Sequence, residues 1–424
     1  MLAALITLAL SFLYDPPTAA HDSLQESATE IGGQLLRDPA VSAALERIKR
    51  DEPQVLADQV RLCEIAAPPF KEGRRAGAIR QAFESVGLKN VRIDRAGNVI
   101  GVRPGKAPKP HLVLSAHLDT VFGEDVDVKT SRSGSLLKGP GISDDCRGLA
   151  VLLGIIRALE EGHFETAGTI TFVGTVGEEG LGDLRGVKEL FGGDLKGQID
   201  RFVSIDGAGL GITNVGVGVL RYRASFKGTG GHSYGDFGIA NPIHALGRAV
   251  NRLADLQVPT TPKTTFNVGR IGGGTSVNSI SSEAWMEVDL RSSDRAALAS
   301  LDVALQKALD AALTDENARW GNRGRLTLAK TVVGNRPAGR VAPDAPIVQA
   351  AVSVTRALGL AVSLDEGSTD ANLPMSLAIP AVTIDGGGVA KGTHSTAEVF
   401  DSTGSWQGTA RAFLLGLALA GKDK

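Results

Sequence analysis

The strongest constraint on the fold is an alternation of short apolar runs with longer helical stretches. Apolar runs at 99–102, 112–115, 170–173 and 202–205 end in glycine or polar loops, and helical spacing governs stretches such as 148–159. The same alternation resumes with a helix at 346–358 and strands at 361–364 and 381–384. It predicts an α/β protein with a mostly parallel sheet and covering helices.

Residues 217–333 follow a different order. We expect a strand at 219–226, a helix at 242–253, strands at 264–271 and 283–290, a helix at 295–313 and a strand at 326–333. This βαββαβ order is ferredoxin-like and predicts a lid or dimerisation domain, inserted into a catalytic domain made of residues 25–216 and 334–424. The 283–290 strand and 295–313 helix suggest self-pairing across a two-fold axis, so we expect a homodimer.

Length and charge limit the possible functions. A chain of 424 residues is long enough for two domains. The net charge is −2 and no basic stripe occurs, which argues against a nucleic-acid partner. Two cysteines, Cys63 and Cys146, are too few for a disulfide framework.

The first 20 residues have the pattern of a signal peptide. An apolar run at 1–13 has the length of a signal-peptide core and is too short to span a bilayer, and Thr18-Ala19-Ala20 suits cleavage. No Lys or Arg precedes the run, which departs from the usual pattern. We expect a periplasmic or secreted protein without a stable membrane span, with a cytoplasmic location as the alternative.

Side chains of types that can bind a metal ion follow five of the predicted strands. Because the carboxyl ends of parallel strands share one edge of a sheet, these side chains are expected to converge. Imidazole and carboxylate groups are ligands that suit zinc. The residues concerned are His117, Asp119, Asp144, Asp145, Glu178, Glu179, Asp206 and His394.

The adjacent acidic pairs indicate more than one cation. Asp144-Asp145 and Glu178-Glu179 each place two carboxylates side by side, which is costly without positive charge nearby. A site for two Zn²⁺ ions, or for Co²⁺ or Mn²⁺, accounts for both pairs. Any one motif alone is also compatible with a solvated loop, and it is the ordered set that favours a dinuclear site.

The same motifs carry a resemblance to a known family. The ordered set SAHLD, GPGxxDD, GEEG, IDG and GTH resembles the dizinc metallopeptidases that include carboxypeptidase G, aminoacylase, succinyl-diaminopimelate desuccinylase and peptidase T. It covers almost all of the chain after residue 30, the inserted domain included. The stretch 365–372 and the long N-terminal helical region are most similar to peptidase T.

The resemblance implies a role for each residue of the set. Asp144 corresponds to a carboxylate that bridges the two metals, and its peptide bond to Asp145 to a cis bond. Glu178 corresponds to the general base and Asp119 to the carboxylate that orients an imidazole ligand. The terminal metal ligands correspond to His117 and Asp206 on one ion, and Glu179 and His394 on the other.

Further residues are implicated on the substrate side. His232 resembles a histidine that reaches the active site of the partner subunit, and Asn278 and Arg291 resemble residues that hold the substrate carboxylate. Ser368 and Thr369 resemble a substrate-side loop. Surface or turn positions remain the alternative for His232, Arg291 and the 368–369 loop. Cys146-Arg147 departs from the family, in which many members have lysine and glycine after the second aspartate.

Together these features predict a metal-dependent hydrolase that cleaves amide bonds of short peptides. An amidohydrolase acting on N-acyl amino acids is the alternative within the same chemistry. A metal-binding pseudoenzyme or binding module is the alternative of another class, and the presence of Glu178 argues against it because only catalysis requires a general base.

Overall fold

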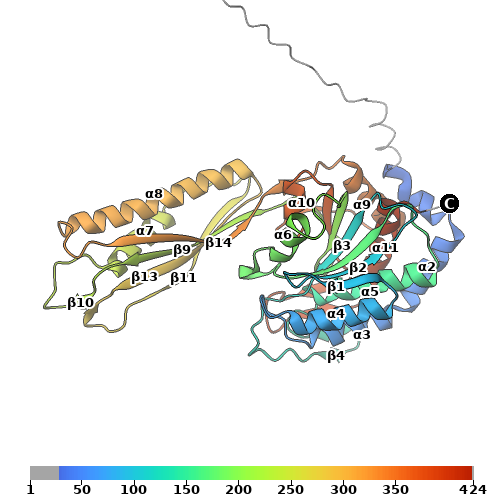
Figure 1. Cartoon of the computed structure of the whole chain (residues 1–424), viewed down its shortest axis with the longest axis horizontal. Coiled ribbons are helices and arrows are strands. Elements are labelled where there is room, and N and C mark those ends of the chain that lie inside the picture. The colour runs from blue at the N-terminus through green and yellow to red at the C-terminus, as the bar shows by residue number, and fades with distance from the viewer. Residues whose placement is uncertain (1–27, 423–424) are drawn as a thin grey trace, which may run out of the picture.

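The computed structural model describes residues 28–422 and has two lobes (Figure 1). The larger lobe is built around a nine-stranded sheet, and the smaller lobe projects from one end of it. The expected signal peptide at 1–20 lies outside the described residues. Among residues 28–422, no helix is both long and apolar enough to cross a membrane.

The middle of the large sheet is parallel, as expected, and its edges are not. Strands β6, β3, β7 and β17 pair in parallel, whereas β1, β2 and β15 pair antiparallel with their neighbours. In sheet order the strands are β1 (Lys89–Ile93), β2 (Val99–Arg103), β6 (Ile170–Thr175), β3 (Leu112–His117), β7 (Arg201–Ile205), β17 (Ala381–Ile384), β8 (Ile212–Gly216) and β15 (Gly339–Arg340), with β16 (Leu364–Gly367) also on β8.

One strand lies later in the chain than the sequence indicates. The apolar run 361–364 predicts a strand, but β16 begins at Leu364 because its parallel partner β8 pairs with residues 364–367. Residues 361–363 only lead into it after the preceding helix has ended. The prediction was therefore right that a strand exists here and wrong about the residues at which it begins and ends.

Helices bury both faces of the central strands. In β3, Leu112, Leu114 and Ala116 pack into one apolar cluster and Val113 into another. Such two-sided burial is typical of parallel strands. The helices are α2 (Pro39–Arg50), α3 (Glu52–Cys63), α4 (Gly73–Ser85), α5 (Cys146–Glu161), α9 (Pro346–Ala357) and α11 (Trp406–Ala420), with α6 (Arg185–Gly192) and α10 (Asn372–Ser376) on the opposite face.

A small antiparallel sheet, which the sequence did not predict, supports two loops of the site. In sheet order its strands are β18 (Val389–Lys391), β19 (Val399–Asp401), β5 (Leu136–Lys138) and β4 (Ser131–Ser133). Its pairing of β5 with β19 brings the loop after residue 138 beside the loop that carries His394. Both loops therefore start from one rigid platform.

The smaller lobe, residues 218–336, is called the lid below and has the expected ferredoxin-like order. Two helices pack on its sheet and form a separate apolar core (Figure 1). In chain order its elements are β9 (Gly218–Lys227), α7 (Pro242–Ala254), β11 (Thr264–Gly273), β13 (Glu283–Ser292), α8 (Arg295–Arg319) and β14 (Thr327–Arg336). A short pair, β10 (Gly231–His232) and β12 (Ser279–Ile280), lies at the end far from the large lobe.

Two details of the lid differ from expectation. Strand β13 lies between β11 and β9, so both of its edges are occupied and it cannot extend the sheet across a two-fold axis. The open edges are those of β11 and β14. Strand β14 also continues to Arg336, three residues beyond the expected boundary at 333.

A buried ion pair ties three parts of the large lobe together. The fully buried Arg147 lies 2.8 Å from Glu52 Oε1 and donates to the carbonyls of Gly386 (2.7 Å) and Ser405 (2.6 Å). We expect Glu52→Gln to lower the free energy of unfolding by about 3–5 kcal/mol, because it leaves a buried charge without its counter-ion. Urea unfolding at neutral pH measures this.

The matched control is Glu84→Gln on α4. Glu84 pairs with Arg80 at 3.0 Å, but both side chains are about half exposed. The Glu84→Gln substitution is expected to lower the free energy of unfolding by no more than about 0.5 kcal/mol. Equal losses in the two variants would contradict the structural role given to the Glu52–Arg147 pair.

Candidate metal centre

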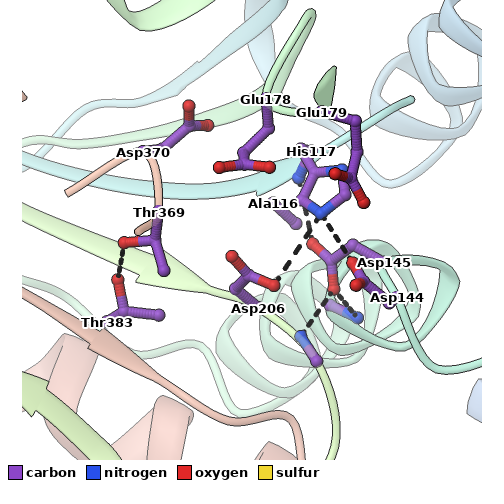
Figure 2. Close-up of polar contacts among 12 residues, drawn as sticks. Ala116, His117, Asp144, Asp145, Glu178, Glu179, Asp206, Thr369, Asp370 and Thr383 are labelled. Atoms are coloured by element: carbon purple, nitrogen blue, oxygen red, sulfur yellow. Dashed lines mark hydrogen bonds and ion pairs between the residues drawn. The ribbon is translucent and has the colours of Figure 1, made fainter. Parts of the chain in front are cut away.

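His117 is the first of the clustered side chains and lies at the carboxyl end of β3. Its ring Nε2 is 2.9 Å from Asp144 Oδ1 and 3.7 Å from Asp206 Oδ1 (Figure 2). Asp206 directly follows β7, which pairs in parallel with β3. Neighbouring strand ends thus deliver an imidazole and a carboxylate to one point, as the sequence predicts.

Asp144 lies between two histidines. Its other oxygen, Oδ2, is 3.0 Å from Nε2 of His394, and the same nitrogen is 3.0 Å from Oε1 of Glu179. One carboxylate therefore joins a His117–Asp206 group to a His394–Glu179 group. This is the arrangement that a bridging ligand between two cations requires.

Asp145 lies close to the same point, but its carboxylate forms hydrogen bonds to backbone N–H groups. His117, Asp145 and Asp206 form one set of donors compact enough to hold an ion, and His117, Asp144 and Glu179 form another. However, Asp145 Oδ1 accepts from the N–H groups of Gly148 (2.9 Å) and Gly207 (3.2 Å), and Oδ2 accepts from the His117 N–H (3.0 Å). Asp145 thus fixes the backbone, whereas the Asp144 carboxylate faces the two histidines. The peptide bond between them is cis.

Asp119 supports the cluster through atoms other than those expected. Nδ1 of His117 lies 2.9 Å from the Asp119 backbone carbonyl and 3.8 Å from its carboxylate. The carboxylate instead accepts from the N–H groups of Glu178 (3.0 Å) and Glu179 (2.8 Å). The carbonyl of Asp119 thus orients the imidazole, and its carboxylate positions the backbone of the glutamate pair.

Glu178 is buried beside an arginine that the sequence interpretation missed. Arg336 Nη1 donates to Glu178 Oε1 at 2.8 Å, and Nη2 donates to the Glu178 carbonyl. Burial raises the pKa of Glu178 well above its usual range, although Arg336 opposes the shift. Arg336 lies beyond the expected lid boundary. The available signal was a basic residue followed by Pro337, where the chain returns to the large lobe.

The charges of the cluster show that it suits cations. Hydrogen bonds to Asp144 and Glu179 raise the pKa of His394 to about 10. Burial lowers the pKa of His117, but Asp144 and Asp206 outweigh it and the pKa is raised. In the metal-free chain, protons on the two histidines thus offset part of the negative charge of the carboxylates. Two imidazoles and three carboxylates match zinc ligands, and metal binding displaces such protons.

The remaining candidates divide into two groups. Arg291, Ser368 and Thr369 line a cavity of about 250 Å³ together with the clustered residues. His232 and Asn278 are exposed on the lid far from the cluster of the same chain, where the Ser233 N–H donates to the Asn278 carbonyl at 3.0 Å. Cavity residues that the sequence interpretation missed are Thr213, Arg221, Arg336, Thr383 and Asp385.

A two-lobed α/β fold with this donor set at the strand ends defines a hydrolase class with a candidate dinuclear metal centre. The family model described as peptidase family M20/M25/M40 matches residues 113–415. The chain belongs to this family, which places it among metal-dependent peptidases and amidohydrolases. The resemblance drawn from the sequence motifs is confirmed.

Individual relatives agree with this membership. The chain is 25% identical over 243 residues to succinyl-diaminopimelate desuccinylase of Corynebacterium glutamicum, covering 54% of this chain and 64% of the relative. The match to a hydrolase of Pyrococcus abyssi spans 32% of that relative, at 35% identity over 120 residues. The chain thus spans less than two thirds of each of these two relatives.

Solved structures share the fold over most of the chain. Aminopeptidase PepT of Bacillus cereus matches with a TM-score of 0.65 and 21% identity, covering 86% of this chain and 97% of PepT. YxeP of Bacillus subtilis, described as a dinuclear metal binding peptidase, matches with a TM-score of 0.64 and 16% identity, covering 88% and 99%. At these identities the likeness shows the fold alone.

Asp385 generates a pH-dependent prediction. Burial raises its pKa from 3.8 to about 6, against the opposing Gly211 N–H. The stability that this group contributes is therefore fully present below about pH 4 and lost as pH rises through 6. We expect the free energy of unfolding of Asp385→Asn, taken relative to wild type, to be up to about 3 kcal/mol more favourable to the folded state at pH 8 than at pH 4. Urea unfolding of the metal-free protein across this window measures it, and a pH-independent difference would contradict the burial argument.

Proposed function

We propose that this protein is a dinuclear zinc hydrolase that cleaves amide bonds of short peptides, with Glu178 as general base. The observation that carries the proposal is the position of Asp144, with one oxygen facing His117 and the other facing His394. Glu178 lies in the same cavity but is not part of either ligand group.

The ligand assignment follows the contacts. His117 and Asp206 would hold one ion, Glu179 and His394 would hold the other, and Asp144 would be available to both. Zinc suits this mixture of nitrogen and oxygen donors, with Co²⁺ or Mn²⁺ as alternatives. When bound, a pair of such ions lowers the pKa of water and polarises a carbonyl group.

The protein's own groups account for proton transfer and substrate orientation. The Glu178 carboxylate accepts a proton from the attacking water and returns it to the leaving nitrogen. Arg291 lines the same cavity and is held by Asp289 at 2.6 Å, and we propose that it binds a substrate carboxylate. Ser368 and Thr369 line the same cavity and are proposed to contact the substrate.

We further propose that the active enzyme is a homodimer in which His232 and Asn278 reach the partner's site. Both are at the end of the lid far from their own cluster. Large apolar side chains are exposed close to them in the sequence, including Tyr234 (89%), Phe237 (71%) and Val277 (102%). Exposed apolar groups gathered in this way are typical of interaction surfaces.

Two alternatives remain to be separated by experiment. The desuccinylase relative removes an acyl group in its named activity, which supports an amidohydrolase acting on N-acyl amino acids. The PepT neighbour supports the peptide substrate. A panel of dipeptides, tripeptides and N-acyl amino acids, tested with zinc-loaded protein, discriminates between them. Absence of turnover on the whole panel with both ions bound would favour a pseudoenzyme.

The first test compares the two neighbouring glutamates. We expect Glu178→Ala to keep two ions per chain and lose turnover by about 10²–10⁴-fold, the usual weight of a positioned general base. We expect Glu179→Ala to lose or weaken one ion, with partial rescue by excess metal. Elemental analysis and turnover on the same samples measure both effects.

Wild-type protein and a chelated sample serve as controls. Chelation is expected to abolish activity and added metal to restore it. Loss of metal in Glu178→Ala together with full metal in Glu179→Ala would reverse the assignment of the pair. Full activity with a single tightly bound ion would refute the dinuclear centre.

A second test concerns assembly. Light scattering is expected to give a dimer mass, and His232→Ala to lower turnover without changing metal content, because the side chain acts in the partner's site. His244→Ala, on the exposed face of α7, is the matched control. A monomer mass independent of concentration would overturn the homodimer.

A further inference from the structure

Arg336 occupies the point where the lid rejoins the large lobe. It is the last residue of β14, and its side chain points back to Glu178, which is 158 positions earlier in the chain. Both side chains are almost fully buried, at 4% and 6% exposed. A lid strand is therefore in direct contact with the proposed general base.

Neighbouring contacts fix the end of this strand. The Asn335 N–H donates to Asp183 Oδ1 at 2.7 Å, and Lys188 Nζ donates to the Asn335 carbonyl at 3.0 Å. Asp183 follows the short turn after Glu179. Two hydrogen bonds of Asn335, the residue before Arg336, thus join the strand end to the segment that follows the glutamate pair.

Arg336 holds Glu178 at two atoms at once. Nη1 donates to the carboxylate Oε1, and Nη2 donates to the backbone carbonyl. Asp119 holds the N–H of the same residue. Glu178 is therefore fixed through its N–H, its carbonyl and one carboxylate oxygen, whereas no hydrogen bond from the described residues reaches Oε2. A planar guanidinium makes such a paired contact and a lysine ammonium does not.

We propose that Arg336 is a positioning residue that fixes the Glu178 carboxylate so that Oε2 faces the reacting water. This inference rests on the proposed function, in which Glu178 is the base. Arg336 acts through Glu178 and not through the substrate. The lid thereby contributes to the geometry of proton transfer as well as to substrate binding.

The contacts distinguish this role from substrate binding. Arg291 is 42% exposed and, among residues 28–422, forms an ion pair only with Asp289, so it is open to a substrate carboxylate. Arg336 is buried, and its donors already reach Glu178 and, at 3.3 Å, the Ser368 hydroxyl. A substrate anion would have to displace the Glu178 carboxylate or carbonyl to bind the Nη atoms of Arg336.

A double-mutant cycle tests the proposal on the full-length, metal-loaded protein. The variants are Glu178→Gln, Arg336→Met and the double variant, assayed on whichever amide substrate the wild type hydrolyses. We expect Arg336→Met to lower kcat by about 10–100-fold with little change in KM, as for other residues that orient active-site groups. We expect the double variant to be no slower than Glu178→Gln alone, because coupled residues are not additive.

Metal content and melting temperature are measured on the same samples. Both ions are expected to remain bound in every variant. Arg223→Met is the matched control, because Arg223 also lies on a lid strand and pairs with Glu287 at 2.9 Å, away from the cavity. It is expected to leave kcat unchanged. If Arg336→Met does not fold, Arg336→Lys keeps the charge and is expected to show the same loss of kcat.

Other outcomes overturn the proposal in distinguishable ways. A raised KM, or a loss that multiplies with that of Glu178→Gln, would make Arg336 a substrate contact. Unchanged kcat in the Arg336 variants would show that the contact between Arg336 and Glu178 has no role in catalysis. Full activity of Glu178→Gln would instead refute the proposed general base, and with it the function on which this inference rests.

Discussion

The site depends on one carboxylate that lies between two imidazoles. Asp144 faces His117 with one oxygen and His394 with the other, and Glu179 and Asp206 add two further carboxylates within the same small volume. Negative groups crowded in this way require positive charge, which protons on the histidines supply in the metal-free chain and cations would supply in the active one. The surrounding structure serves to hold these groups together.

Backbone anchoring keeps the crowded groups in place. Asp145 accepts three backbone N–H groups and so fixes the turn that presents Asp144. Glu398 accepts from the Gly141 N–H (3.0 Å) and Ser143 N–H (2.8 Å), which joins that turn to the segment after His394. These anchors come from separate segments, so the candidate ligands are held by the fold as a whole and not by one local motif.

The lid is both a separate unit and a part of the site. Its helices and sheet form their own apolar core, so it can act as a rigid body. Its base nevertheless contributes Arg291 to the cavity and Arg336 to Glu178. This arrangement connects the part of the lid that lines the cavity to the residue proposed to move the proton.

The sequence alone determined the α/β alternation, the ferredoxin-like order of the lid and the identity of the clustered histidines and carboxylates, because strand periodicity and the residues that follow a strand are local properties. Only the tertiary structure decided that the Asp145 carboxylate binds backbone N–H groups, that the Asp119 carbonyl rather than its carboxylate contacts His117 most closely, and that β13 is an interior strand. It also revealed Arg336, whose partner is 158 positions away. Such choices depend on strand pairing and side-chain direction between distant segments, and no local pattern encodes them.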